Sequence, residues 1–183
     1  MVIEAQTRTS AWMVDPTHSI AEFAVKHLVV TTVKGRFRDL EGRIEINEAQ
    51  PENSSVEAKI AVASVDTNVA DRDAHLRSDD FFNAEKFPYI VFQSTRVERI
   101  NDERFKLVGD LTIRDVTKEV VLEGEYDGQV DNPWGNHRAA FTATTQMSRK
   151  EFNVLYNQLL ETGGAVVGDN VKITLHIEAI RQS

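Results

Sequence analysis

The densest group of ionisable side chains in the sequence lies between Asp71 and Asp80. Its single histidine, His75, has the chemistry of a general base, and Asp71 or Asp79 could hold the imidazole in place. Such a pair would need a substrate-sized cavity beside it. An isomerase or hydrolase acting inside the fold is therefore one hypothesis for this segment.

The same residues are also typical of a short solvated helix. Asp73 and Arg77 stand four residues apart, which is the spacing of a surface ion pair on a helix. A third interpretation places the segment at the rim of a binding site, where Arg72, His75 or Arg77 would meet the polar head of a ligand. We favour the solvated helix, because it needs no further partner.

Other catalytic and metal-binding signatures are missing from the sequence. There is no cysteine, which excludes disulfides, thiolate metal sites and a cysteine nucleophile. No G-x-S-x-G, P-loop or G-x-G-x-x-G motif occurs. The histidines show neither the H-x-x-x-H nor the H-x-H spacing of a metal site, so we expect no metal and no cofactor. They are His18, His27, His75, His137 and His176.

The net charge and the hydropathy of the chain limit the classes of binding partner that the sequence favours. The formal net charge is -8, which makes nucleic acid or an anionic membrane surface an unfavourable default partner. Apolar runs such as Leu28–Val30 are far shorter than the roughly 18 residues of a membrane helix. No signal-like apolar segment stands at Met1–Ala11. This predicts a cytoplasmic protein, or a periplasmic or secreted one if the chain is a processed form.

Most of the chain alternates apolar and polar residues with the period of a β-strand. The segments Ser55–Ser64, Arg104–Asp115 and Val171–Ala179 show this pattern, which is typical of antiparallel sheet with one dry face. About eight or nine such segments predict an all-β fold, an antiparallel up-and-down β-barrel of about eight strands. Asp71–Ser78 and Ser148–Gln158 predict one or two short helices, and a phase slip within Arg36–Asn47 predicts a β-bulge.

A barrel of about eight strands is either filled by its own side chains or holds one ligand. Alanines on the apolar faces favour some empty volume, although a plain core explains the same residues. The apolar side chains expected to point inward are Phe23, Val25, Phe37, Ala58, Ile60, Val62, Phe92, Leu107, Leu111, Phe141, Ala143 and Met147.

Ordered motifs along the chain resemble the YceI-like family of polyisoprenoid-binding, lipocalin-like proteins. The motifs include Trp12–Ser19, Arg72–Phe82, Gly109–Thr117, Ser148–Phe152 and Glu161–Asp169. The resemblance runs from Trp12 to Arg181, so we expect a single YceI-like domain over residues 12–183 after an N-terminal extension of residues 1–11. It implies a barrel around a long hydrophobic cavity, a polyprenyl or related amphiphilic lipid as ligand, and a homodimer.

The resemblance also suggests where a ligand would lie. Leu155-Tyr156-Asn157 stands where many relatives have a Thr-Trp pair before the asparagine, and it is expected near the cavity. Arginines suit a phosphate or pyrophosphate head, whereas a phenol or quinone needs only neutral donors. The side chains expected at the polar head are Arg36, Arg72, His75, Arg77, Arg149 and Asn157, and Leu155 and Tyr156 join the apolar set.

The sequence therefore predicts a non-enzymatic protein that sequesters or transports an apolar lipid inside its barrel. Two alternatives remain open at this point: a cavity enzyme such as an isomerase or hydrolase, and a stress-response scaffold with a filled barrel.

Overall fold

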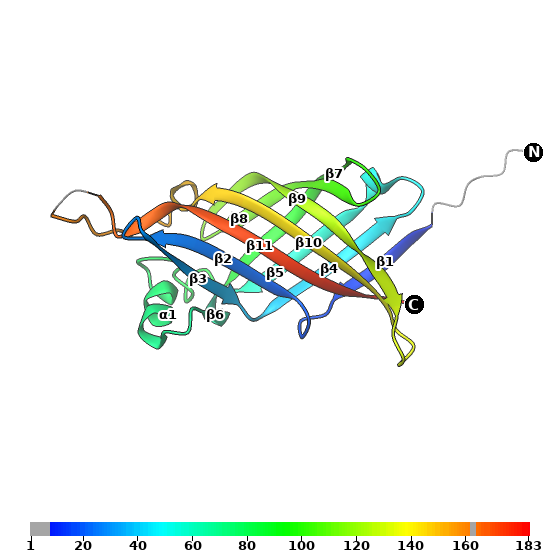
Figure 1. Ribbon diagram of the computed structural model, residues 1–183, viewed down its shortest axis with the longest axis horizontal. Coiled ribbons are helices and arrows are strands. Elements are labelled where there is room, and N and C mark those ends of the chain that lie inside the picture. The colour runs from blue at the N-terminus through cyan, green and yellow to red at the C-terminus, as the bar shows by residue number, and fades with distance from the viewer. Residues whose placement is uncertain (1–7, 162–163) are drawn as a thin grey trace, which may run out of the picture.

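The computed structural model describes residues 8–161 and 164–183, which form one antiparallel sheet and a short helix (Figure 1). Residues 1–7 of the expected N-terminal extension, and residues 162–163 of the Glu161–Asp169 motif, lie outside the described residues. The strands are β1 (Thr9–Val14), β2 (Ile20–His27), β3 (Thr31–Phe37), β4 (Leu40–Asn47), β5 (Ser55–Ala61), β6 (Val65–Asp66), β7 (Tyr89–Arg99), β8 (Arg104–Ile113), β9 (Val116–Asp131), β10 (His137–Ser148) and β11 (Val167–Arg181). The helix is α1 (Ala70–Arg77), and single 3-10 turns occur at η1 (Pro51–Asn53), η2 (Val62–Ser64) and η3 (Arg149–Phe152).

Eight strands close the barrel, as the sequence predicted. They follow one another around the ring in the order β1, β4, β5, β7, β8, β9, β10 and β11, and pairing of β1 with β11 completes it. The long strand β11 serves two neighbours, since Ala179–Arg181 pair with β1 while Val167–His176 pair with β2. The hairpin β2–β3 and the short strand β6 thus extend the same sheet from β11.

Strand β1 begins at Thr9, three residues before the start expected for the domain. Thr9 pairs with Asn47 and Ala11 pairs with Glu45, so these residues belong to the barrel wall. Trp12 follows them and is only 2% exposed. Burial of this indole fixes which face of β1 is turned inward.

The phase slip in Arg36–Asn47 is a break between two strands and not the bulge that the sequence suggested. Strand β3 ends at Phe37 and β4 begins at Leu40, and both side chains are buried. Strand β3 pairs with β2 and β6, whereas β4 pairs with β1 and β5. The chain therefore changes partners at Arg38–Asp39, and the two intervening residues shift the alternation.

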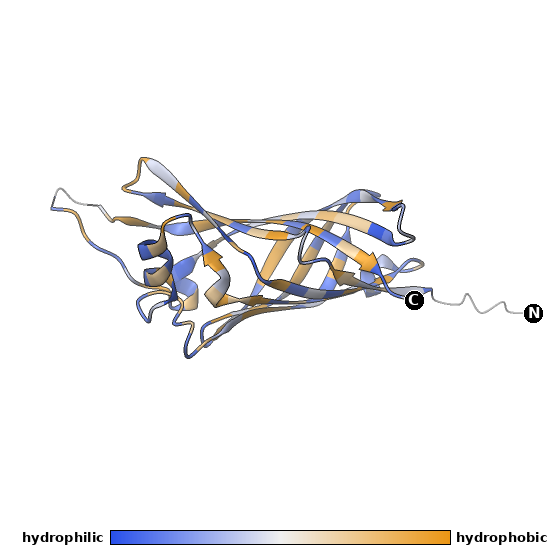
Figure 2. Cartoon of the chain, turned by 90° about the horizontal axis from the view of Figure 1, so that it is seen from below, coloured by the Kyte–Doolittle hydropathy of each residue, from blue (hydrophilic) through white to orange (hydrophobic). Residues whose placement is uncertain are grey.

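Apolar and polar residues alternate along many of the strands (Figure 2). The apolar ones supply the buried clusters and the cavity wall inside the barrel. At the α1 end lies a second buried cluster of Phe37, Val62, Val65 and Ile90, against which Leu76 of α1 packs. Helix α1 confirms the predicted short helix. The second expected helix, Ser148–Gln158, was wrong beyond its first turn: η3 ends at Phe152, and Asn153 takes a left-handed conformation with φ 59°.

Candidate ligand cavity

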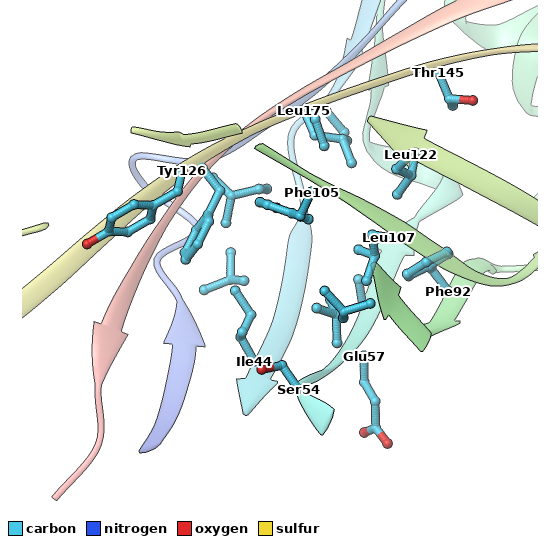
Figure 3. Close-up of a pocket in the computed structure, with 18 of the residues that line it drawn as sticks. Ile44, Ser54, Glu57, Phe92, Phe105, Leu107, Leu122, Tyr126, Thr145 and Leu175 are labelled. Atoms are coloured by element: carbon cyan, nitrogen blue, oxygen red, sulfur yellow. The ribbon is translucent and has the colours of Figure 1, made fainter. Parts of the chain in front are cut away.

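The barrel encloses a cavity of about 580 Å³ whose wall is mostly apolar (Figure 3). Phe105 and Leu107 on β8, Leu122 on β9 and Leu175 on β11 border the same space. The volume lies within the roughly 300–1,000 Å³ of pockets that hold one small ligand. The barrel is therefore not filled by its own side chains, which overturns the alternative of a plain core.

Ten of the fourteen side chains expected in the apolar site line this cavity. That they contact a ligand stays a prediction, because only their position is established. The ten are Phe23, Phe37, Ala58, Ile60, Phe92, Leu107, Leu111, Phe141, Ala143 and Met147.

The other four lie elsewhere, each for a different reason. Val25 shares the phase of Phe23 but lies beyond the end of the cavity, where it pairs with Val33 and Val171. Val62 belongs to η2, which turns it into the buried cluster beside α1. Leu155 is 57% exposed. Tyr156 packs its ring against His75 and Phe81, with centroids 4.7 and 5.1 Å away.

Many residues that line the cavity were missing from the expected set. Most of them occupy the same alternating strand positions as residues that were expected to point inward. They share a face with residues that were chosen: Phe105 alternates with Leu107, and Ile173 with Leu175 and Ile177. The segments that form β1 and β4 were expected to be strands, but their inward side chains were not placed in the cavity set. The main additions are Trp12, Val14, Leu40, Ile44, Ile46, Val56, Ile90, Val97, Phe105, Ile113, Val120, Leu122, Tyr126, Ala139, Ile173, Leu175 and Ile177.

The polar lining residues gather at the end of the barrel opposite α1 (Figure 1). Most come from the β4–β5 connection and from the β7–β8 turn with its flanking strand ends, while Glu57 lies on β5 and Gln129 on β9. Carboxylates outnumber arginines in this set. Arg99 pairs with Asp102, and Arg104 lies 3.8 Å from the Glu125 carboxylate. We name this the polar end, formed by Glu48, Ser54, Glu57, Arg99, Asn101, Asp102, Glu103, Arg104 and Gln129.

Tyr126 and Thr145 are neutral polar side chains that line the cavity outside the polar end. Tyr126 on β9 packs against Phe141, with ring centroids 5.6 Å apart. Burial raises the pKa of the Tyr126 phenol, so it stays protonated and able to donate a hydrogen bond. Thr145 on β10 contributes a hydroxyl further toward the α1 end.

None of the six side chains expected at a polar head group lines the cavity. Arg72 donates through Nε and Nη2 to the hydroxyl and carbonyl of Thr67, at 2.7 and 2.9 Å. Arg36 lies 3.6 Å from Asp66 on the neighbouring strand, and His75 bonds Asp80 at 2.8 Å. Arg77 ends helix α1, away from the cavity wall.

Arg149 and Asn157 hold the chain together instead of facing the cavity. The Arg149 guanidinium is buried and donates to the carbonyls of Gly168, Val154 and Tyr156, at 2.8, 2.7 and 2.9 Å. Burial lowers the pKa of Arg149, and the charge of Asp169 partly opposes that shift. These bonds replace helical ones, which explains why the helix expected through Gln158 stops at Phe152.

Asn157 closes the same segment onto β11. Its side-chain amide donates to the carbonyl of Val167 at 2.8 Å, and its carbonyl oxygen accepts from the Val167 amide at 3.0 Å. This two-way bond ties the segment after η3 to the start of β11, which is a structural task.

A carboxylate pair at the Asp15 turn has the spacing of metal ligands but is already bridged by an arginine. Asp15, His18 and Glu178 place their ligand atoms within 4.8 Å of one another. Arg138 donates to both Asp15 and Glu178. Burial alone would raise the Asp15 pKa, but hydrogen bonds from Thr17, Arg138 and His18 outweigh it and hold the pKa well below its ordinary value.

A closed antiparallel barrel around an apolar cavity defines the class of small β-barrels that can hold one ligand inside. The family model described as the YceI-like domain matches residues 12–179, and the chain belongs to this family. Protein YceI of Escherichia coli O157:H7 is 38% identical over 165 residues, covering 90% of this chain and 83% of that relative.

Solved structures support the same fold. BcnA of Burkholderia cenocepacia matches with a TM-score of 0.79 at 21% identity, covering 90% of this chain and 98% of that one. A polyisoprenoid binding domain from Saccharophagus degradans, implicated in plant cell wall breakdown, matches with a TM-score of 0.71 at 13% identity, covering 93% and 98%. Within the described residues, no helix is long and apolar enough to span a bilayer.

Proposed function

We propose that this protein binds one long-chain apolar lipid in its barrel, and sequesters or carries it without chemical change. The observation that carries the proposal is the cavity of about 580 Å³ with its mostly apolar wall. A chain of isoprene units or a similar hydrocarbon is the ligand class whose surface such a wall complements. The polyisoprenoid binding domain of Saccharophagus degradans, which shares the fold, is consistent with this ligand class.

The energetics favour slow release. Each buried CH₂ contributes about 0.8 kcal/mol, so a long chain approaches the practical ceiling of roughly 18–21 kcal/mol. Ordering the flexible tail offsets much of that sum. We therefore expect lipid that remains bound during purification.

The polar end points to an uncharged head group. Three carboxylates lie around the cavity there, from Glu48, Asp102 and Glu103, against the two arginines Arg99 and Arg104. The carboxylate of Glu57 points away from the other lining side chains, toward the outer face of β5 (Figure 3). Both arginines already face carboxylates. A phosphate or pyrophosphate would meet excess negative charge, whereas a phenol, quinone or alcohol would find neutral and acidic hydrogen-bonding partners.

The arrangement of ionisable groups supports a role without catalysis. General acid–base chemistry needs two such groups converging on one reacting atom. Among the described lining residues outside the polar end, the ionisable side chains are Glu22 on β2 and Tyr126 on β9. The His75 cluster, which was the catalytic hypothesis from sequence, does not line the cavity.

Native mass spectrometry of freshly purified protein, followed by solvent extraction, tests the proposal. We expect a lipid adduct of one molecule per chain, and uptake of a prenyl phenol or prenyl quinone by protein stripped of lipid. Ala58→Phe adds a ring inside the cavity and should reduce uptake at least tenfold. Val91→Phe, on the exposed face of adjacent β7, is the matched control and should bind as the wild type does.

Uptake that survives Ala58→Phe unchanged, or a protein that takes up none of these lipids, would show that the cavity is not a lipid site. A chemically altered lipid after incubation would contradict the non-catalytic part alone.

A further inference from the structure

The α1 end of the barrel carries an unusually exposed apolar turn between β2 and β3. Leu28, Val29 and Val30 are 40%, 72% and 77% exposed. Leu159, in the segment beside it, is 86% exposed. We name these four residues the apolar tip.

The backbone of this turn is strained as well as apolar. Leu28 and Val29 both adopt left-handed conformations, with φ of 52° and 66°. Asn-Gly is the relaxed and soluble choice for two consecutive positions of this kind, and a β-branched residue there is a genuine outlier. Strain of this type is typical of functional sites, and here it displays apolar side chains to solvent.

The β2–β3 turn and the segment before β11 lie at the same end of the molecule as α1 (Figure 1). The Leu28 amide donates to the carbonyl of Val166 at 3.0 Å, which joins the β2–β3 turn to the segment before β11. Leu159 pairs with Ala165 across an isolated bridge in that segment. The exposed apolar side chains thus belong to one connected end of the molecule.

Lysines stand behind the apolar tip on the outer face of the same strands. Lys26 on β2, Lys34 on β3 and Lys172 on β11 are exposed, and none of them forms an ion pair within the described residues. Lys34 and Lys172 flank one residue of β2, because each pairs with Ala24 across its own ladder. We call these three the lysine collar, which is a local positive patch on a chain of net charge -8.

We propose that the α1 end docks on an anionic lipid bilayer, with the apolar tip inserted among the head groups and the lysine collar against the phosphates. Apolar insertion and basic contact are the two signals that together give stable interfacial binding. A second copy of the chain fits this surface poorly, since a two-fold contact would bring one lysine collar against the other. Docking goes beyond the proposed function and needs no ligand in the cavity.

Vesicle flotation of the full chain tests the docking. Wild-type protein should float with phosphatidylcholine vesicles containing about a third phosphatidylglycerol, and less with phosphatidylcholine alone or in high salt. Leu28→Asn with Val29→Gly relaxes the turn and removes two apolar groups, so it should fold normally and bind at least tenfold more weakly. Val130→Ser with Trp134→Ser alters exposed apolar residues in and beside the β9–β10 turn and should bind as the wild type does.

Each alternative has a distinct result. Wild-type protein that floats with neither vesicle, or equal flotation of the relaxed-turn variant, would overturn the proposal. Loss of vesicle binding in the Val130/Trp134 variant alone would also overturn it. So would a wild-type protein that binds no vesicles but forms a dimer, if the relaxed-turn substitutions convert that dimer to monomer. Native mass spectrometry of the same variants separates docking from lipid uptake, because cavity lipid should persist when docking is lost.

Discussion

Replacing Arg149 by methionine separates a structural role for this buried cation from a role at the ligand. The side chain is 6% exposed and donates three hydrogen bonds of 2.7–2.9 Å to backbone carbonyls. Methionine keeps much of the apolar stem and removes every donor. The carbonyls of Gly168, Val154 and Tyr156 would then lose their charged partner.

The magnitude follows from those three contacts. A hydrogen bond to a charged group contributes roughly 1.5–3 kcal/mol to the free energy of unfolding. The loss of three such bonds could therefore cost well above the free energy lost in a typical single substitution. The variant no longer has to desolvate a guanidinium, whose burial lowers the Arg149 pKa, and this offsets part of the loss. We expect the free energy of unfolding to fall by about 3–4 kcal/mol.

Urea unfolding followed by tryptophan fluorescence measures this change, because Trp12 is buried while Trp134 is 82% exposed. Arg149→Lys should recover little, since one ammonium cannot reach three carbonyls in the fork geometry of arginine. Arg43→Met provides the matched surface control, and it should change the unfolding free energy by less than about 0.5 kcal/mol. Lipid uptake per folded molecule should stay at the wild-type value in all three variants.

One combination of results would refute the reasoning. If Arg149→Met unfolds at the wild-type urea concentration and loses lipid uptake, the guanidinium serves the ligand and its backbone contacts contribute nothing to stability.

Two further predictions concern stability. The folded-state pKa of Asp15 lies below its ordinary value of 3.8, so the stabilisation that its carboxylate gives is complete above about pH 5 and is lost as the pH falls. Asp15→Asn should therefore make the unfolding free energy depend less on pH between about pH 5 and pH 2. An unchanged slope would contradict this. Gly109→Ala should cost about 1–3 kcal/mol in urea unfolding, because its Cβ would lie 2.5 Å from the carbonyl oxygen of Gln93 on the paired strand. Gly168→Ala is the milder comparison, with nearest contacts of 3.3 Å, and an equal loss in both variants would rule out the steric cause.

The positions of the strands could be predicted, because the alternation of apolar and polar residues depends only on neighbours in the sequence. In Arg104–Ile113, Phe105, Leu107 and Leu111 alternate with polar residues, and the structure turns these three toward the cavity. The helix at Ala70–Arg77 was likewise visible from charge spacing. Alternation assigns a residue to a face, and that is sufficient wherever the strand continues.

Alternation fails where the chain leaves its strand or passes the end of the cavity. Val62 keeps the phase of Ala58 and Ile60, yet η2 redirects it into the cluster beside α1. Val25 keeps the phase of Phe23 but lies beyond the cavity. Periodicity carries no information on strand length relative to the barrel, so neither position could be corrected from sequence.

The sequence by itself determined the class of fold, the family and the inward face of most strands, because each follows from local residue order. Only the tertiary structure decided that the barrel is hollow, and that its polar end lies opposite α1. It also reassigned Arg72, Arg149 and Asn157 to backbone hydrogen bonds. The sequence alone does not show whether an arginine or asparagine side chain hydrogen-bonds to a ligand or to a backbone carbonyl. The partners depend on how the loops fold back on the strands: Thr67 lies in the turn before α1, and the segment after η3 returns to the start of β11 at Val167–Gly168.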